Sequence, residues 1–457
     1  MHKPAIFFII PNEGRVTTIL RTDIFRHLVK RRPKLVILSP FYKDQAFQKE
    51  FSGSNIILES LTDPPKNLLI TLILKIRDVV LKIDHPKIQQ AINIELSIAK
   101  RKVTGTPPLE FLAVALRKII KPFSQQLQKF FNWLEEKMFM SKDYAEIFNN
   151  AFPQTIVLGT LGADRYDLVF LAYARKYKIP AVIVDMPWSY FDNRLFYTPR
   201  PFNKIALWNN IFKEKLMTIH KIPEERIAVT SSARYDYYTR YNIKDKRLFF
   251  KEIGANFKKV LITYAAISDP WHPFQIEVIK MMLEAIQHGS LIKPCQLMIR
   301  LSPAQENINP YYELKAKFPE LLLEQAREKP DKEHLVNLFY YSDLTLSVGS
   351  SLALDAAILN KPMIYIGFTG LGAANNYDGV LKLLYQFDFL KRALGTQGVK
   401  VAWSLGELID YINEYFKNPS KDQEVRKHLV KEFLGEVDGK AGERIAKVIL
   451  KTAGYFD

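Results

Sequence analysis

Short apolar runs of strand length alternate with amphipathic segments along the first half of the chain. Segments such as 165–178 and 210–220, which lie between such runs, carry apolar residues at helical spacing. Short continuous apolar runs that alternate with helices are typical of parallel strands buried on both faces. The runs lie at 5–10, 34–38, 154–159, 180–184, 203–208 and 226–231. This pattern predicts an α/β domain.

A second series of the same kind fills the other half of the chain, after a charged stretch at 241–259. At 457 residues the chain is too long for one ordinary core. The expected fold class is α/β, with two Rossmann-like doubly wound domains that face a cleft. The second series has apolar runs at 259–265, 296–302, 320–324, 344–348, 362–368 and 400–403, and helical patterns at 274–287 and 309–317.

Residues 65–145 interrupt the alternation with long helical patterns. In 67–83, polar residues recur at spacings of three and four, which marks one polar helix face. In 108–139, an apolar stripe includes Phe123 and Phe130. These patterns predict a helical insertion in the first domain, and the stripe favours packing against the protein core. Binding of these helices to an anionic membrane surface is the alternative.

Composition narrows the classes of partner and compartment. The net charge of +17 suggests a polyanionic partner, but we find no zinc-finger spacing and no aromatic RNA-binding signature. No nucleic-acid partner is therefore expected. The single cysteine, Cys295, cannot form an internal disulfide, which predicts a reducing, cytoplasmic compartment. Its apolar neighbours predict a buried residue rather than a nucleophile. Charged residues interrupt 67–83, so no membrane span is expected.

The clearest candidate chemistry follows the apolar run 344–348. Gly349 permits a tight turn and a close approach by a ligand, and Ser350 and Ser351 offer hydroxyl groups where a helix begins. Asp355 lies about one helical turn further on and can accept hydrogen bonds from the vicinal hydroxyls of a ribose. The set predicts a site for a nucleotide diphosphate. The alternative is a helix cap followed by an acid favoured by the helix dipole.

The segment LVNLFYYSDLTLSVGSSLALDAAILNKPMIYIGF (335–368) carries a family resemblance. It resembles the nucleotide-binding half of GT-B glycosyltransferases, and is particularly similar to the lineage of CDP-glycerol glycerophosphotransferases and UDP-N-acetylglucosamine 2-epimerases. In that family the acid on this helix holds the donor ribose and the hydroxyl loop holds phosphate. The resemblance therefore implies that Asp355 binds the ribose, and that Ser350 and Ser351 bind phosphate.

Three further segments extend the resemblance to roughly residues 150–450. The first resembles the family's RxHP motif through Arg300 and Pro303, with Ser302 in place of the histidine. The second resembles a hinge-proximal segment that usually reads VTGSPRFD, with Ser231 in place of the glycine. The third resembles the closing helix, which in GT-B proteins returns to the first domain. The segments are LMIRLSP (297–303), WNNIFKEKLMTIHKIPEERIAVTSSARYDYY (208–238) and FLGEVDGKAGERIAKVI (433–449).

The resemblance implies that the two domains bind different substrates. Residues 1–240 form an acceptor-side domain that includes the helical insertion. Residues 241–435 form the nucleotide-donor-binding domain. Residues 436–457 form a helix that returns to the first domain.

An inverting transferase needs a base to take the proton from the acceptor hydroxyl. Asp185 and Asp192 lie in 182–196, which resembles a WDN loop of glycosyltransferase-like proteins, and Glu13 follows the first strand. These three acids are candidate bases, and a turn or helix-cap role is the alternative for each. His272 follows the first strand of the second domain and is a candidate contact for a donor phosphate, with an ordinary loop histidine as the alternative.

The expected function is that of a metal-independent GT-B transferase without a cofactor. Its donor is a UDP-sugar or a CDP-polyol, Arg300 stabilises the leaving group, and the acceptor is a hydroxyl of a cell-envelope glycan or lipid-linked intermediate. The expected location is the cytoplasm, with peripheral binding to the inner face of the membrane as a further expectation. One alternative is a nucleotide-sugar 2-epimerase or hydrolase, but the epimerases' adjacent acids are reduced to Asp355 after Leu354. Another is a non-catalytic nucleotide- or glycan-binding protein, which Ser302 suggests.

Overall fold

The computed structural model describes residues 5–81, 85–86, 90, 94, 97, 123–162, 164–184, 202–267, 272, 274–302, 305–324, 331–370 and 377–455. The chain forms two compact units. The first contains the described residues up to 90, then 123–239, and finally those from 434 onward; the second is built mainly from 240–433.

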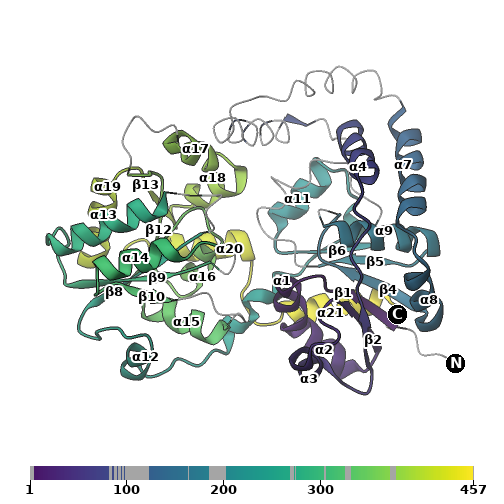
Figure 1. Ribbon diagram of the computed structural model, residues 1–457, viewed down its shortest axis with the longest axis horizontal. Helices are drawn as coiled ribbons and strands as arrows, with labels where there is room; N and C mark the ends of the chain where they lie inside the picture. The colour runs from purple at the N-terminus through teal and green to yellow at the C-terminus, as the bar shows by residue number, and fades with distance from the viewer. Residues whose placement is uncertain are drawn as a thin grey trace. The chain divides into compact units, whose positions relative to one another are not determined.

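Unit 1 contains a seven-stranded parallel sheet in the order β3-β2-β1-β4-β5-β6-β7 (Figure 1). The strand order reverses between β1 and β4, which makes their carboxyl ends the topological switch point of this sheet. The strands are β1 (Ala5–Ile9), β2 (Lys34–Ser39), β3 (Ile56–Ser60), β4 (Pro153–Leu158), β5 (Ala181–Ile183), β6 (Lys204–Leu207) and β7 (Ile227–Val229). The helices are α1 (Glu13–Arg15), the π-helix η1 (Val16–Leu20), α2 (Asp23–Arg31), α3 (Gln45–Phe51), α4 (Leu68–Val80), α7 (Ser124–Phe139), α8 (Lys142–Ala151), α9 (Arg165–Tyr177), α11 (Asn210–Thr218), the 3-10 helices η3 (Glu224–Arg226) and η4 (Ala233–Thr239), and α21 (Ala441–Thr452).

Helices bury both faces of this sheet, because successive strand residues point to opposite sides. On one face Phe8 packs against Phe25 of α2, with ring centroids 6.1 Å apart. On the other face Phe7 packs against Phe148 of α8, with centroids 5.2 Å apart. Both strand residues are fully buried. The continuous apolar run in β1 thus contributes side chains to the apolar layers on both faces of the sheet.

Buried ion pairs attach the helical insertion to the body of unit 1. Arg77 of α4 is fully buried, and its Nε lies 3.1 Å from Oε1 of the buried Glu135 of α7. The other carboxylate oxygen of Glu135 lies 3.0 Å from Nη2 of Arg175 of α9. Since removing one partner would leave a buried charge uncompensated, these pairs make the docking of α4 and α7 specific.

The prediction that the apolar stripe of α7 packs into the core is wrong for part of the described helix. Phe123 and Phe130 are more than half exposed, whereas Phe131, Glu135 and Phe139 are buried. The buried face of the described helix includes Glu135, which pairs with the buried Arg77 and with the partly buried Arg175. The rest of the stripe, N-terminal to 123, lies outside the described residues. None of the described helices is both long enough and apolar enough to span a bilayer.

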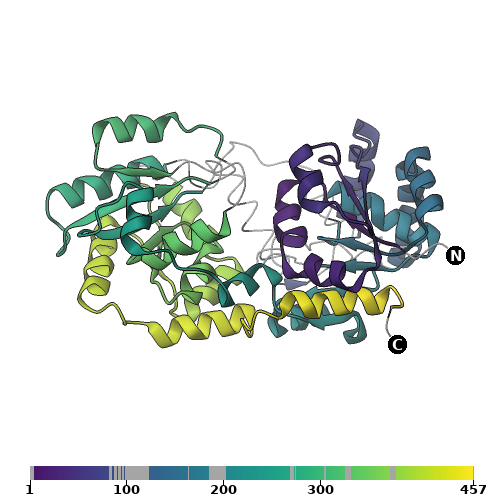
Figure 2. The ribbon, with the colours of Figure 1, turned by 90° about the horizontal axis from the view of Figure 1, so that it is seen from below.

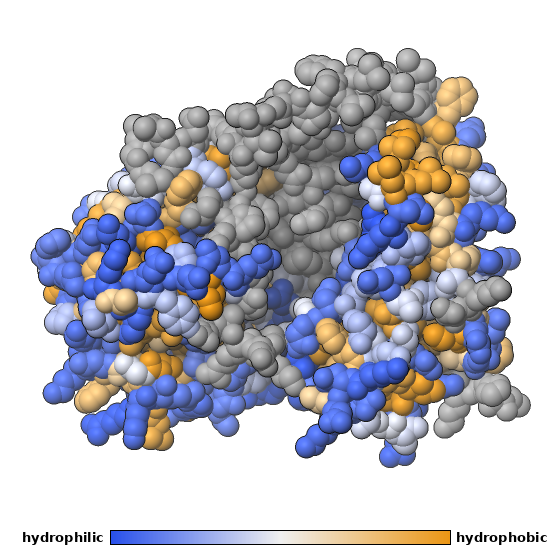
Figure 3. Space-filling model, in the orientation of Figure 1, coloured by the Kyte–Doolittle hydropathy of each residue, from blue (hydrophilic) through white to orange (hydrophobic). Residues whose placement is uncertain are grey.

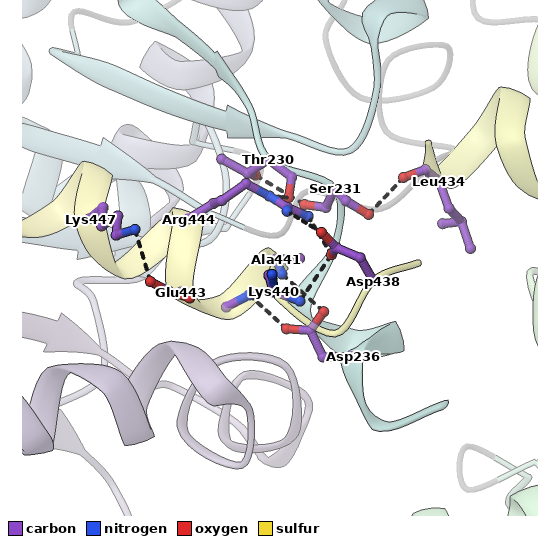
Figure 4. Close-up of polar contacts among 11 residues, drawn as sticks. Thr230, Ser231, Asp236, Leu434, Asp438, Lys440, Ala441, Glu443, Arg444 and Lys447 are labelled. Carbon is purple, nitrogen blue, oxygen red and sulfur yellow. Dashed lines mark hydrogen bonds and ion pairs between the residues drawn. The ribbon is translucent and has the colours of Figure 1, made fainter. Parts of the chain in front are cut away.

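The chain returns from unit 2 to unit 1 through α21, which packs beside α2 (Figure 2). The carboxylate of Asp236 faces the first turn of α21 and accepts hydrogen bonds from the buried amides of Ala441, at 3.0 Å, and Gly442, at 2.7 Å (Figure 4). Arg444 donates from Nε to the carbonyl oxygen of Thr230 at 2.9 Å. An ion pair with this arginine lowers the pKa of Asp438. Polar contacts from the end of β7 and from η4 thus hold the start of α21.

Unit 2 contains a six-stranded parallel sheet in the order β10-β9-β8-β11-β12-β13. Its strand order reverses between β8 and β11, so the switch point lies at the carboxyl ends of these two strands. The strands are β8 (Val260–Ala265), β9 (Cys295–Arg300), β10 (Leu322–Glu324), β11 (Leu344–Ser347), β12 (Met363–Ile366) and β13 (Lys400–Ala402). The helices are α12 (Lys246–Glu252), α13 (Gln275–Gln287), α14 (Asn309–Lys317), α15 (Lys332–Tyr341), α16 (Leu352–Ile358), α17 (Tyr377–Leu384), α18 (Asp388–Gly395), α19 (Leu405–Lys417) and α20 (Gln423–Leu434).

The predicted fold class is confirmed: both sheets have the Rossmann-like order, and a C-terminal helix returns to the first. Every strand predicted from an apolar run is present. The edge strand β3 was not predicted, because it is only partly buried and includes polar residues. Burial of Cys295 is also confirmed, and it raises the pKa of the thiol to about 11.

Candidate functional site

The switch point of unit 2 is formed by the ends of β8 and β11. The hydroxyl of Ser347, at the end of β11, donates to the carbonyl oxygen of Ala265, at the end of β8, at 2.9 Å. The chain then turns at Gly349, whose φ of 55° lies in the left-handed region. A Cβ there would also lie 3.2 Å from Cδ1 of Leu390. Glycine is therefore required at the first residue of the hydroxyl-bearing loop.

The two serines of this loop have different roles in the structure. Oγ of Ser350 accepts a hydrogen bond from the amide of Leu352 at 3.2 Å, and the carbonyl of Ser350 accepts one from the hydroxyl of Tyr365 at 2.6 Å. Ser351 is the N-cap residue of α16, but its side chain makes no capping hydrogen bond. Ser350 thus stabilises the turn, and the hydroxyl of Ser351 is not used for capping.

Asp355 lies in the first turn of α16, between the buried residues Leu354 and Ala356. It is half-buried, as is Ser351. Residues four apart lie on the same face of a helix. The structure therefore places the Ser351 hydroxyl and the Asp355 carboxylate on one face of α16, as a shared ligand requires.

Arg300 ends β9, the strand next to β8. Its backbone pairs in register with Ala265 on one side and with Glu324 of β10 on the other. Neighbouring strands lie about 4.8 Å apart, so β9 is about 10 Å from β11 across the sheet. Arg300 therefore lies at the carboxyl edge of the sheet, one strand away from β8. Ser302 follows two residues later, and Pro303 lies outside the described residues.

His272 is fully buried. Its Nε2 lies 3.3 Å from the carbonyl oxygen of Phe368, so the proton is on Nε2 and Nδ1 is left as an acceptor. Burial lowers the pKa of His272. The imidazole is therefore neutral near pH 7, and contact with a donor phosphate stays a prediction for this residue.

The candidate base Glu13 lies at the carboxyl end of β1 and forms an ion pair with Arg21. Arg21 also binds Glu50 through two bonds, Nε to Oε1 at 2.6 Å and Nη2 to Oε2 at 2.9 Å. These carboxylates raise the pKa of Arg21. The carboxylate of Glu13 is therefore engaged by an arginine in this structure. Asp185 and Asp192 lie outside the described residues.

The structure reveals a polar cluster at the switch point of unit 1 that the sequence did not indicate. Asp167 of α9 is fully buried, and its Oδ2 accepts hydrogen bonds from Nη2 of Arg15 at 2.8 Å and from the amide and hydroxyl of Thr160. The Arg15 guanidinium lies against Gly159, where a Cβ would be 1.8 Å from Nη1. The cluster therefore joins the carboxyl ends of β1 and β4.

Asp164 lies beside this cluster as the N-cap residue of α9, where its Oδ1 accepts from the amide of Tyr166 at 2.9 Å. An N-cap bond and the nearby Arg15 both favour the carboxylate. Burial and the adjacent Asp167 outweigh them and raise the pKa of Asp164. A half-buried carboxyl group with a raised pKa at a sheet's switch point is a candidate acid–base group.

A family model described as CDP-glycerol:poly(glycerophosphate) glycerophosphotransferase matches residues 205–451, more than half of the chain. This range includes the whole candidate site of unit 2. A search of curated proteins finds no match to the sequence.

Solved structures share the fold across nearly the whole chain. S. aureus MnaA with UDP is 12% identical and has a TM-score of 0.55, covering 99% of this chain and 98% of MnaA. The UDP-GlcNAc 2-epimerase of Methanocaldococcus jannaschii is 14% identical, with a TM-score of 0.55 and coverages of 98% and 99%. A variant of the wall teichoic acid polymerase TagF is 12% identical, with a TM-score of 0.52 and coverages of 99% and 89%. At such identities the likeness establishes the GT-B fold.

Proposed function

Because the chain belongs to the CDP-glycerol:poly(glycerophosphate) glycerophosphotransferase family, we propose that it transfers a polyol phosphate from a CDP-linked donor to a hydroxyl of a cell-envelope polymer or lipid-linked acceptor. It is a transferase with the GT-B fold. A UDP-sugar donor at the same site is the alternative, favoured by the structural likeness to UDP-bound MnaA.

The observation that carries this proposal is the Gly349–Ser351 loop at the switch point of unit 2. In a doubly wound sheet the ligand binds at this point, beyond the carboxyl ends of the strands. Hydroxyl and backbone donors in the loop bind the diphosphate, Asp355 binds the ribose hydroxyls, and Arg300 stabilises charge on the leaving group.

The reaction is a displacement at phosphorus. The acceptor hydroxyl loses its proton to a base and its oxygen bonds to the phosphorus that carries the polyol, while the bond to the bridging oxygen of the diphosphate breaks. CMP leaves and keeps that oxygen. A cationic group near the bridging oxygen stabilises the charge that develops there, which is the role proposed for Arg300.

We assign the base to Asp164, with Asp185, Asp192 and Glu13 as the competing candidates. Asp164 caps α9 in the segment that follows β4, beside the Arg15–Asp167 cluster, and the resemblance places the acceptor on this unit. Unlike Glu13, it has no arginine bound to its carboxylate among the interactions of the described residues, and burial favours its proton-accepting character.

Replacement of Asp355 by alanine should weaken nucleotide binding. At about 100 times its Kd, a nucleotide raises the free energy of unfolding by about 2.7 kcal/mol. Hydrogen bonds to a charged group contribute about 1.5–3 kcal/mol, so the variant should lose at least half of that stabilisation at the same concentration. Thermal shifts with CMP, CDP, UDP and ADP measure this effect and identify the nucleobase of the donor nucleotide.

Asp410→Ala is the matched control, because Asp410 is an exposed acid on α19 of the same unit. It should respond to nucleotide as the wild type does. The donor-site assignment fails if no nucleotide stabilises the wild type, or if both variants lose the effect equally. Products formed from the donor without acceptor distinguish a hydrolase or epimerase from a transferase.

Apolar side chains gather on the exposed surface of α4 and α7 (Figure 3). Leu68 is 87% exposed and Leu72 is 52% exposed, one turn apart on α4. The patch also includes Leu69, Ile76, Phe130 and Trp133. The exposed lysines on these helices are Lys75, Lys129 and Lys137, and Lys66 is exposed just before α4. Apolar residues flanked by lysines bind anionic bilayers, so we propose that this patch docks on the inner face of the membrane.

The double replacement Leu68→Ser/Leu72→Ser should lower the fraction of protein that sediments with anionic phospholipid vesicles by at least about half, because burying each leucine contributes about 1.5–3 kcal/mol. Leu248→Ser/Ile292→Ser is the control, since these two residues of unit 2 are also more than half exposed. Equal sedimentation of both variants, or none by the wild type, contradicts docking by this patch.

A further inference from the structure

A basic groove lies between α2 and α21 on unit 1. It is a cavity of ≈ 270 Å³. Two of its basic residues come from α2 and two from α21, and the side chains of Ala446 and Leu450 form its apolar floor. The lining residues are His27, Arg31, Glu443, Ala446, Lys447, Leu450 and Lys451.

The groove exists because the two helices start in close contact. A Cβ at Gly442 would lie 2.7 Å from the backbone nitrogen of Ile24, so only glycine allows α21 to approach the start of α2 this closely. His27 and Arg31 are spaced by four residues along α2, and Lys447 and Lys451 by four along α21. Each pair therefore lies on one helix face, and the two pairs line one channel.

The charge of the groove is positive. Glu443 is the single acid of the lining, and its Oε1 lies 2.8 Å from Nζ of Lys447. Arg31 and Lys451 are in the last turns of their helices, where basic residues complement the helix dipole. His27 and Lys447 lie earlier in their helices, so the dipole does not account for them.

The direction of α2 relates the groove to the acceptor side of unit 1. The helix begins after the loop at the carboxyl end of β1 and ends just before β2 begins, so it runs from the carboxyl edge of the sheet to the amino edge. Its nine residues span about 13.5 Å. The groove lining on α2, His27 and Arg31, runs from the middle of the helix to its end, toward the amino edge. A chain of phosphodiesters that extends away from an acceptor end at the carboxyl edge would run in this direction.

We propose that the groove between α2 and α21 binds the phosphodiester backbone of the polymer that the enzyme extends. The inference rests on the proposed function, since it assumes a polyanionic acceptor. Binding of this polyanion would give a function to part of the net charge of +17. The groove is lined by residues of unit 1 and the proposed donor site by residues of unit 2, so the two assignments can be tested with different variants.

The test compares Lys447→Gln/Lys451→Gln with the control Lys49→Gln/Lys176→Gln, which removes two exposed lysines from α3 and α9 of the same unit. The probes are an inorganic polyphosphate chain, a single-stranded DNA of equal charge, and inorganic monophosphate, titrated into the full-length protein at fixed salt. Nucleotide stabilisation is measured on the same samples.

We expect the groove variant to bind polyphosphate about five- to tenfold more weakly than the wild type, which is the scale of two exposed charge contacts. The control variant should bind less than about twofold more weakly than the wild type. The wild type should prefer polyphosphate to DNA. The stabilisation by nucleotide should be unchanged in both variants.

Three results would overturn the proposal. Equal losses of affinity in the two variants would report net charge alone. Equal affinity of the wild type for DNA and polyphosphate, with both lost together in the groove variant, would mark a general polyanion-binding surface. Full polyphosphate affinity in the groove variant would show that the groove does not bind the chain. Absence of nucleotide stabilisation in every form contradicts the proposed function instead, whatever the polyphosphate titration shows.

Discussion

Replacement of Asp164 by asparagine is expected to lower kcat by about 10²–10⁴-fold, the contribution of a general base. Asparagine can still accept the hydrogen bond from the Tyr166 amide, so α9 keeps its cap while the carboxylate is lost. Stabilisation by nucleotide should remain at the wild-type level, because the donor loop lies in unit 2. Initial rates at saturating donor and acceptor, together with thermal shifts, measure the two effects.

Asp44→Asn is the matched control for this variant. Asp44 caps α3 of the same unit through its Oδ1 and the amide of Phe47, but it lies on the exposed surface. It should leave kcat unchanged. If Asp164→Asn transfers at the wild-type rate, the base lies elsewhere, and Asp185, Asp192 and Glu13 are the next variants to measure.

The pH profile gives an independent test of the assignment. A base acts as the carboxylate, and burial together with Asp167 raises the pKa of Asp164. Activity should therefore fall with decreasing pH at a higher pH than for an ordinary aspartate, whose pKa is about 3.9. Arg15 and Asp167 are the charged groups that act on this carboxylate, and Tyr166 is its neighbour on α9.

Asp167→Asn should shift this acidic limb toward lower pH. The substitution removes the negative charge that raises the pKa of Asp164 and leaves Arg15, which lowers it. A purely structural role for Asp167 would lower the rate without moving the limb. In Asp164→Asn the limb should disappear, and its persistence there contradicts the assignment.

Replacement of Asp236 by alanine is expected to lower the free energy of unfolding of unit 1 by about 3 kcal/mol. The variant leaves the buried amides of Ala441 and Gly442 without their acceptor, and each unsatisfied buried group costs about 1–3 kcal/mol. Because a chain with two domains need not unfold in a single transition, the measurement is urea unfolding followed by fluorescence, with limited proteolysis between α20 and α21 as a local readout.

Asp44→Ala is the control for this stability effect. It removes one exposed capping bond and should cost about 1 kcal/mol. Asp236→Asn keeps one acceptor oxygen and should fall between the two. A cost for Asp236→Ala no larger than that for Asp44→Ala would show that α21 is held by its apolar contacts with α2 alone.

The sequence by itself determined the strands of both sheets except the edge strand β3, and the position of the Gly349–Ser351 loop. Buried parallel strands need apolar residues on both faces, so runs such as 5–10 and 344–348 were visible without knowledge of their neighbours. The turn at Gly349 was also visible, because a left-handed φ selects glycine locally. Ser351 and Asp355 are four residues apart, so helical periodicity alone predicts that they share one face.

Only the tertiary structure decided which charged groups are buried and what they bind. Asp236 meets the amide of Gly442 206 residues away, and Arg15 meets Asp167 152 residues away. Glu135 lies on the buried face of α7, paired with Arg77, whereas Phe130 of the same helix is exposed. Hydrophobic periodicity records how an element repeats along the chain, but the partner of a buried charge depends on packing between distant segments. The fold therefore followed from local pattern, whereas Asp164 and the basic groove required the assembled unit.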